Sequence, residues 1–332
     1  METLLIEQWL AETDAVEILD EASLTLARDA LRALPVPKDL IDRALLVASE
    51  LGRNQLRHAR RGCIGCRRVE RSGRPGIEII AADAGKGIDD IAAALDATAR
   101  DAGSLGVGIG SVKRLATELD IDVRMGEGTA LFVRIFAADT PKSREVGIYG
   151  RALPGESRSG DHAAFARLGE TIHAVICDGL GHGHEARVAS DRAIDVFRRH
   201  ANDRPEALID ATHRGLTNTR GIVMAAAHIA ADTMELASAG NIEAQLTSFR
   251  STRRFGGTAA TVGGRPGPLR ARAEHAPFAT DDVLVMMTDG IVTKASIEND
   301  AMLLRMHPAA IAQRVLERFA RATDDALVLV VR

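Results

Sequence analysis

Several acidic residues in the second half of the chain lie in turns beside apolar, strand-like runs. They are Asp161, Asp178, Asp289, Asp324 and Asp325. Carboxylate oxygens, with water and a backbone carbonyl, are ligands that Mg²⁺ and Mn²⁺ prefer, whereas zinc would draw on His and Cys. Residues so far apart in the sequence can meet only in a folded domain. The pattern predicts one shared site for hard divalent cations.

Such a site indicates hydrolysis at phosphorus. Two divalent cations about 4 Å apart can share a bridging hydroxide and stabilise the entering and leaving oxygens of an in-line attack. This chemistry needs no nucleophilic side chain. Each aspartate taken alone is also a common helix cap or turn residue, so the hypothesis depends on the whole set of turns.

Three stretches in the first half of the chain have the composition of a nucleotide site. Glu50, Asn54 and His58 share one face of a predicted helix, although a solvated polar stripe has the same spacing. Asp83 begins DAGKG, where a carboxylate could accept a hydrogen bond from an exocyclic amine, but DxGxG is also a plain turn. Residues 104–111, SLGVGIGS, open a predicted helix, and free N–H groups at such a position can bind phosphates.

The elements that must position these residues alternate between helical and strand-like patterns. Helices are predicted over about 1–34, 40–60, 185–200, 205–216 and 308–322. The strand-like runs are 62–70, 76–82, 130–136, 171–177, 221–230, 235–239, 283–287 and 326–331. A chain of 332 residues with this alternation predicts two mixed α/β domains of roughly 150 residues each.

Composition excludes several other classes of protein. The 46% hydrophobic and 27% charged residues are typical of a soluble globular protein, and a net charge of -4 gives no general attraction to nucleic acid or to an anionic membrane. No apolar run approaches the ~20 residues of a membrane span, and an acidic N-terminus is unlike a signal peptide, so we expect a cytoplasmic protein. Cys63 and Cys66 form a lone CxxC, which we interpret as ordinary reduced thiols.

Eight arginines lie between Arg53 and Arg74. A solvated rim of the helix and hairpin is one interpretation of them. A docking patch for an acidic or phosphorylated partner is the alternative.

In their order along the chain, the three stretches of the first half resemble the N, G1 and G2 boxes of the GHKL (Bergerat-type) ATP-binding fold, an α/β sandwich. The resemblance implies that Glu50 is a general base, that Asn54 binds the Mg²⁺ bridging the phosphates, and that Asp83 recognises adenine. The other implied contacts are Gly85 and Gly87 at the adenine pocket, Gly106, Gly108 and Gly110 at the phosphates, and Thr129 nearby. Ser104 stands where the first glycine of the G2 box is usual.

The short form of this domain, with VKRLATELDI after the glycines, is similar to RsbT-type serine/threonine switch kinases and less so to RsbW-type anti-sigma kinases. Such kinases phosphorylate Ser or Thr on small STAS-domain regulators. The resemblance therefore implies a STAS-domain partner.

In the second half, SGD, DGLGHG, GNI, TDG and TDDA follow one another as in the SpoIIE/RsbX branch of the metal-dependent, PPM-class serine/threonine phosphatases, an α-β-β-α sandwich. The resemblance implies that the metal ligands are Asp161, Asp178, the carbonyl of Gly179, Asp289 and Asp324, with Asp325 beside them. Leu327 stands where Thr or Ser is usual. His182 and His184 are candidates for protonating the leaving seryl oxygen because they follow Asp178 closely, although both could be structural or solvent-facing.

We therefore expect a helical leader over 1–34, an ATP-binding domain over 35–138, a linker over 139–146 and a phosphatase domain over 147–332. The implied cofactors are two Mn²⁺ or Mg²⁺ ions, and ATP with Mg²⁺. The implied substrate is a phosphorylated STAS-domain protein of a bacterial partner-switching pathway, and a homodimer is compatible with the sequence. The alternatives are a non-catalytic, ATP-sensing switch that sequesters a partner, and an ATPase with a structural C-terminal half.

Overall fold

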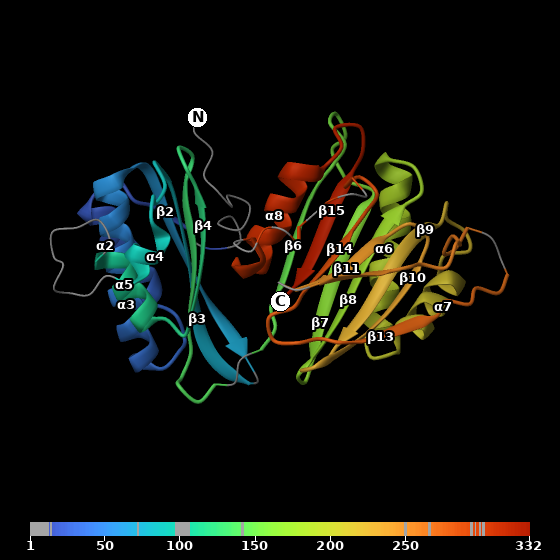
Figure 1. The fold of residues 1–332 in the computed structure, drawn as a ribbon, viewed down its shortest axis with the longest axis horizontal. Coiled ribbons are helices and arrows are strands. Elements are labelled where there is room, and N and C mark those ends of the chain that lie inside the picture. The colour runs from blue at the N-terminus through green and yellow to red at the C-terminus, as the bar shows by residue number, and fades with distance from the viewer. Residues whose placement is uncertain are drawn as a thin grey trace. The chain divides into compact units, whose positions relative to one another are not determined.

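The chain forms two compact units, Met1–Lys142 and Ser143–Arg332 (Figure 1). The computed structural model describes residues 13, 15–71, 73–96, 107–140, 143–248, 251–264, 267–292, 295, 297–298, 300 and 303–332. Within these residues, no helix is both long enough and apolar enough to cross a membrane.

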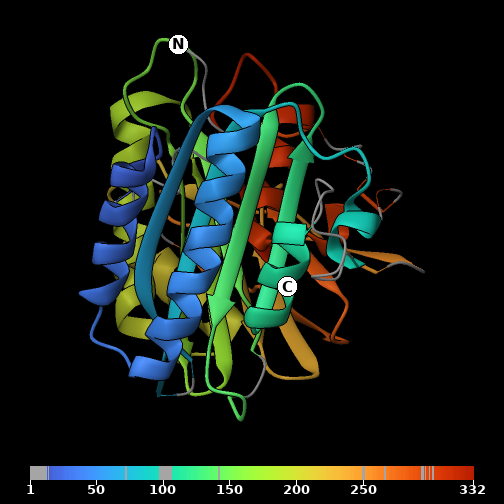
Figure 2. The ribbon, with the colours of Figure 1, turned by 90° about the vertical axis from the view of Figure 1, so that its left-hand side faces the viewer.

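The first unit is a five-stranded antiparallel sheet in the order β1-β2-β3-β5-β4, with its helices on one face (Figure 2). Its strands are β1 (Val16–Glu17), β2 (Ala59–Arg71), β3 (Arg74–Gly85), β4 (Glu118–Arg124) and β5 (Gly128–Ile135). Its helices are α2 (Glu21–Arg32), α3 (Lys38–His58), α4 (Ile91–Asp96) and α5 (Val107–Leu115). Apolar residues of α2, α3 and the helix-facing side of the sheet form one core.

The expectation of a single helical stretch over residues 1–34 is wrong within the described residues. Val16 pairs with Ile64 of β2 as part of a short strand, and helix α2 begins only at Glu21. Asp20 sets this start because its carboxylate accepts a hydrogen bond from the Ser23 N–H at 2.8 Å. Leucines on one side of α2 are buried in the same core as α3, so β1 and α2 are parts of the first unit.

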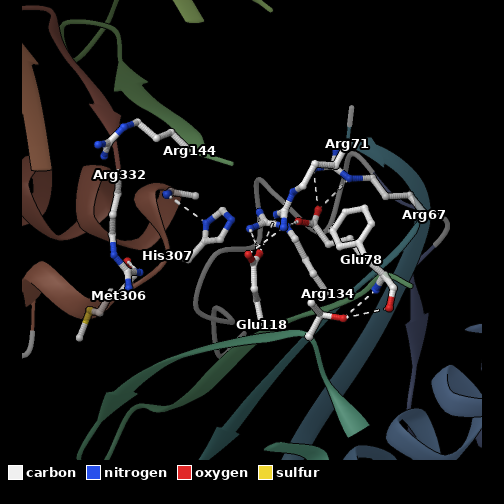
Figure 3. Close-up of polar contacts among 12 residues, drawn as sticks. Arg67, Arg71, Glu78, Glu118, Arg134, Arg144, Met306, His307 and Arg332 are labelled. Atoms are coloured by element: carbon white, nitrogen blue, oxygen red, sulfur yellow. Dashed lines mark hydrogen bonds and ion pairs between the residues drawn. The ribbon is translucent and has the colours of Figure 1, made fainter. Parts of the chain in front are cut away.

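The opposite face of this sheet carries a buried network of charges (Figure 3). Glu78 accepts from Arg134 Nε at 2.7 Å and pairs with Arg67 Nη2 at 2.7 Å. Beside them, both nitrogens of the Arg71 fork donate to Glu118 at 2.8 Å. A buried carboxylate is tolerated only when cations compensate it, as they do here.

The arginines that follow the nucleotide-site helix are largely engaged within their own unit. Acidic residues of the first unit pair with Arg53, Arg61, Arg67, Arg68, Arg71 and Arg74. These pairs favour the interpretation as a solvated rim over that of a docking patch for the exposed arginines, but not for Arg71, whose side chain is 2% exposed.

The second unit has four layers, with two five-stranded sheets packed between helices (Figure 1). The first sheet has the order β13-β10-β9-β8-β7 and consists of β7 (Asp161–Leu168), β8 (Thr171–Gly179), β9 (Ile222–Ile229), β10 (Thr233–Ala239) and β13 (Ala273–Pro277). The second has the order β12-β11-β14-β15-β6 and consists of β6 (Val146–Arg151), β11 (Glu243–Thr247), β12 (Thr252–Phe255), β14 (Val283–Met287) and β15 (Ala326–Val331). Helices α6 (Gly183–His200) and α7 (Pro205–Gly215) cover the first sheet, and α8 (Pro308–Phe319) packs on β6 and β15, beside the 3₁₀ turn η1 (Leu303–Arg305). The expected α-β-β-α sandwich is confirmed.

Candidate metal and nucleotide sites

Asp161 and Asp178 lie directly opposite one another. Asp161 begins β7 and Asp178 lies near the end of β8, and the antiparallel register pairs the two residues. Side chains alternate along a strand, so Asp178 shares the face of Ile176, which packs in the core between the two sheets. The hydroxyl of Thr288, which follows β14, donates to Asp161 Oδ2 at 2.8 Å. Both carboxylates therefore lie at one end of the inter-sheet core.

Turns of the second sheet bring further aspartates to the same end. Asp289 follows β14 by two residues and accepts a hydrogen bond from Asn241 Nδ2 at 2.9 Å. Asp325 directly precedes β15, and its Oδ2 accepts from the N–H of Gly160 at 2.7 Å. Gly160 precedes Asp161, so this bond holds two carboxylates from different sheets beside each other.

The carboxylates are close enough to alter one another's ionisation. Burial raises the pKa of Asp161 to about 7, and the charges of Asp325 and Asp289 act in the same direction. Burial raises the pKa of Asp178 to about 9, and the neighbouring charges of Asp161 and Asp289 add to it. Burial, followed by the charge of Asp289, also raises the pKa of Asp324. Uncompensated negative charge of this kind would be relieved by a divalent cation.

The donor set fits Mg²⁺ or Mn²⁺ better than zinc because it consists of oxygens. A Cβ added at Gly160 would lie 3.2 Å from Asp325 Oδ2 and 3.6 Å from the Gly179 carbonyl oxygen, so these two acceptors border one small space. Among the described residues, no three or more His, Cys, Asp and Glu side chains are grouped so that they could hold a metal ion by themselves. Mg²⁺ is usually held by one or two carboxylates and several waters, so an ion at these turns would take water and the carbonyl as further ligands.

The two candidate histidines lie in the loop after β8 and in the first turn of α6. Gly181 and Gly183 adopt φ of 90° and 74°, a left-handed conformation that favours glycine. His182 lies between them, exposed, with Nδ1 at 3.1 Å from Glu156 Oε1. His184 is exposed in the first turn of α6. The Glu156 carboxylate thus orients the His182 ring.

The first unit contains a cavity of about 410 Å³ between α3, the end of β3 and the segments after it. It brings together Asn54, Asp83, Gly85, Gly87 and Thr129. Glu50, Gly108 and Gly110 are not among the described residues that line it, and Gly106 lies outside the described residues.

The polar groups of this cavity are held by short-range contacts. Asp83 Oδ1 accepts from the Gly85 N–H at 2.9 Å, while burial raises the pKa of this carboxyl against that bond. A Cβ at Gly108 would lie 2.6 Å from Asn54 Nδ2, so only glycine fits at the start of α5 without displacing the asparagine. Glu50 Oε1 lies 3.8 Å from Arg53 Nη1.

Sequence reasoning missed Gln55 as a residue of the cavity wall. Its Nε2 donates to the carbonyls of Cys63 on β2 and Ala82 on β3, each at 3.1 Å. This side chain therefore fixes α3 against the strand that carries Asp83. Its position four residues after the buried Leu51 was the available signal, because residues at this spacing share a helix face.

Sequence models of two families match the chain in succession. The family described as Histidine kinase-like ATPase domain matches residues 17–135. The family described as Stage II sporulation protein E (SpoIIE) matches residues 169–332. The two matches fall in the two structural units.

Individual relatives agree with these matches. The serine/threonine-protein kinase RsbT of Bacillus subtilis (strain 168) is 36% identical over 126 residues, which are 36% of this chain and 93% of that protein. A chain of the solved structure "The bacterial stressosome: a modular system that has been adapted to control secondary messenger signaling" is 28% identical with a TM-score of 0.53, covering 57% of this chain and 100% of that one. RsbX in complex with magnesium is 18% identical with a TM-score of 0.51, covering 58% of this chain and 96% of its own, and shows a shared fold. The chain is therefore an RsbT-like, histidine kinase-like ATPase domain fused to a SpoIIE-type phosphatase domain.

Proposed function

We propose that the second unit is a metal-dependent phosphoserine/phosphothreonine protein phosphatase. The observation that carries the proposal is the convergence of acidic turns from both sheets at one end of the sandwich. Asp161 and Asp178 face each other in register, and Asp325 is bonded to the residue before Asp161. Asp289 and Asp324 raise the pKa of Asp178, as neighbouring negative charges do.

In this proposal Asp161, Asp178, Asp289, Asp324 and the carbonyl of Gly179 hold two Mn²⁺ or Mg²⁺ ions, with Asp325 beside them. Bound ions of this kind supply a hydroxide at neutral pH and neutralise charge on the phosphoryl group. The protein's own groups fix the geometry: Thr288 orients Asp161 and Asn241 orients Asp289.

His182 is the proposed proton donor to the leaving seryl or threonyl oxygen. A general acid must reach the leaving group, and His182 supports this role because it is exposed in the loop four residues after Asp178. Glu156, at 3.1 Å from Nδ1, would hold the ring so that Nε2 carries the transferred proton.

The first unit is proposed to bind ATP with Mg²⁺ in its cavity and to act as a serine/threonine switch kinase. Asp83 would accept from the adenine amine, and Asn54 would hold the Mg²⁺. Glu50, on the same helix, would be the general base toward the acceptor hydroxyl. The likeness to RsbT, a serine/threonine-protein kinase, supports this assignment.

The proposed partner is a STAS-domain protein that carries the phosphorylated Ser or Thr, in a partner-switching pathway of the stressosome type. The relation to RsbT and to a chain of a stressosome structure supports this substrate class. One polypeptide would then hold the activities that add and remove the same phosphate.

Phosphate release from a phosphorylated STAS-domain protein tests the proposal. The purified chain is assayed with Mn²⁺ and with EDTA, as wild type, as Asp178→Asn and as Asp210→Asn. Asp210 is a matched control because it lies on α7, where it pairs with Arg214. We expect Mn²⁺-dependent release by wild type and Asp210→Asn and a loss of at least about a hundredfold in Asp178→Asn, since one carboxylate ligand is removed. No release from several such substrates would favour the non-catalytic switch.

A further inference from the structure

Three arginines of the second unit lie in or beside the acidic turns: Arg158, which is exposed three residues before Asp161, Arg220 and Arg321. The side chains of Arg220 and Arg321 differ in their contacts. Arg220, just before β9, pairs with Glu185 of α6. Arg321 lies between α8 and the turn that contains Asp324, and its side chain is exposed. In the part of the chain that the structure describes, the Arg321 guanidinium forms no hydrogen bond or ion pair. Its donors are therefore available to a ligand.

The backbone of Arg321 is fixed at the metal-site turn. Its N–H donates to the carbonyl of Gly290 at 2.7 Å, and Gly290 directly follows Asp289. Its carbonyl accepts from the guanidinium of Arg151 on β6. The preceding residue, Ala320, forms a bridge with Ile291. The point from which the Arg321 side chain extends is thus held next to one proposed metal ligand.

Arg321 is also close in the chain to a second proposed ligand. It stands three residues before Asp324, at the start of the turn that leads into β15. Among the described residues, no ion pair joins the two side chains, so the guanidinium is not neutralised by this carboxylate.

We propose that Arg321 binds the phosphoryl group of the phosphorylated substrate. This inference rests on the proposed phosphatase function of the same site. A phosphoryl dianion that approaches a cluster of carboxylates is repelled, and a cation at the rim offsets that repulsion. The guanidinium plane can donate two parallel hydrogen bonds to phosphate oxygens. Arg220 is less suited because it would first have to leave Glu185.

The test uses the full chain loaded with Mn²⁺ and a phosphorylated STAS-domain protein as substrate, with inorganic phosphate as a competitive inhibitor. Wild type is compared with Arg321→Ala, Arg321→Lys and Arg220→Ala. Arg198→Ala is the control, because this arginine pairs with Asp195 on the exposed side of α6. We expect Arg321→Ala to raise both KM and the inhibition constant of phosphate about tenfold, with a smaller change in kcat. Lys keeps the charge but not the fork, so Arg321→Lys should fall between wild type and Arg321→Ala.

Mn²⁺ binding, measured from the EPR signal of the free ion, separates phosphoryl binding from damage to the site. Loss of a positive charge beside Asp324 should leave Mn²⁺ affinity unchanged or increase it. Weaker Mn²⁺ binding in Arg321→Ala would assign the arginine a structural role and overturn the inference. Unchanged KM and phosphate inhibition, or the expected effects in Arg220→Ala instead, would overturn it as well.

The proposed function can fail independently of this inference. If wild type releases no phosphate, the phosphatase proposal fails, and calorimetric binding of inorganic phosphate to the Mn²⁺-loaded chain still tests Arg321. Binding that is lost in Arg321→Ala would support the inference. Equal binding by wild type and Arg321→Ala would overturn it.

Discussion

Replacing Glu78 with Gln should destabilise the first unit by about 3 kcal/mol. Removing one partner of a buried ion pair costs roughly 3–5 kcal/mol because the remaining charge is left without compensation. The Glu78 and Arg134 side chains are 2% and 7% exposed and meet at 2.7 Å (Figure 3). We expect the lower end of the range because Glu118 remains 3.7 Å from Arg134 and the Arg67 side chain is 38% exposed.

Hydrogen exchange of the β3 and β5 amides measures this loss within the first unit. Glu70→Gln is the matched control, since its pair with Arg68 is exposed and should contribute at most about 0.5 kcal/mol. Replacing both Glu78 and Arg134 with Leu should recover most of the loss, because it removes the two buried charges together. Equal effects of Glu78→Gln and Glu70→Gln would refute the reasoning.

The pH dependence of this loss has a definite sign. Burial acts to raise the pKa of Glu78, but the charges of Arg134 and Arg67 outweigh it and hold the pKa below the ordinary value. A carboxyl with a lowered pKa stabilises the fold above its unfolded pKa of about 4.3 and loses that contribution as the pH falls through the folded pKa. The difference in the free energy of unfolding between wild type and Glu78→Gln should therefore be largest at pH 7 and decrease at acidic pH.

Two further predictions concern single residues. Burial lowers the pKa of His228 to about 4, with the facing His173 adding to the effect, so wild-type stability should fall as the pH drops from about 6.5 toward 4. In urea unfolding, His228→Gln should reduce the loss of unfolding free energy over this pH range by about 1–2 kcal/mol, a value that allows for the partly exposed ring. An unchanged pH dependence would contradict the assignment of this loss to His228. Gly108→Ala should weaken binding of a fluorescent ATP analogue at least about tenfold because its Cβ would lie 2.6 Å from Asn54 Nδ2. Gly256→Ala has open space around its Cβ and should bind the analogue like wild type. Equal affinities of the two variants would contradict the prediction, because the Asn54 side chain would then have moved aside without affecting binding.

The sequence predicted the turns that carry the aspartates because the end of an apolar run is a local signal. It could not predict that Asp161 and Asp178 would face each other, since register depends on pairing between strands. It also passed over Thr288, whose role appears only when the turn after β14 meets β7. The aspartates that meet at this end of the sandwich were thus predictable as a set, and their role as metal ligands stays a prediction; the groups that orient them were not predictable.

In the first unit, hydrophobic periodicity in the sequence predicted the apolar face of α3 and the strand that carries Asp83. Strand β1 did not, because a two-residue strand exists only through its pairing with β2. Cys63 and Cys66 illustrate how strand geometry separates the side chains of a short sequence motif. Three residues apart on β2, they are buried and face opposite sides of the sheet, so the CxxC spacing does not bring the two thiols together here.

Thr288 couples the spacing between the two sheets to the position of Asp161, a proposed metal ligand. Its hydroxyl donates to Asp161 on the first sheet at 2.8 Å and accepts from the Leu327 N–H on the second at 2.9 Å. The unusual Leu327 is compatible with this link because its backbone, rather than its side chain, takes part. A partner that shifted one sheet past the other, even slightly, would pull on the carboxylate through this hydroxyl. A displacement between the sheets would in this way reach a carboxylate of the proposed metal site.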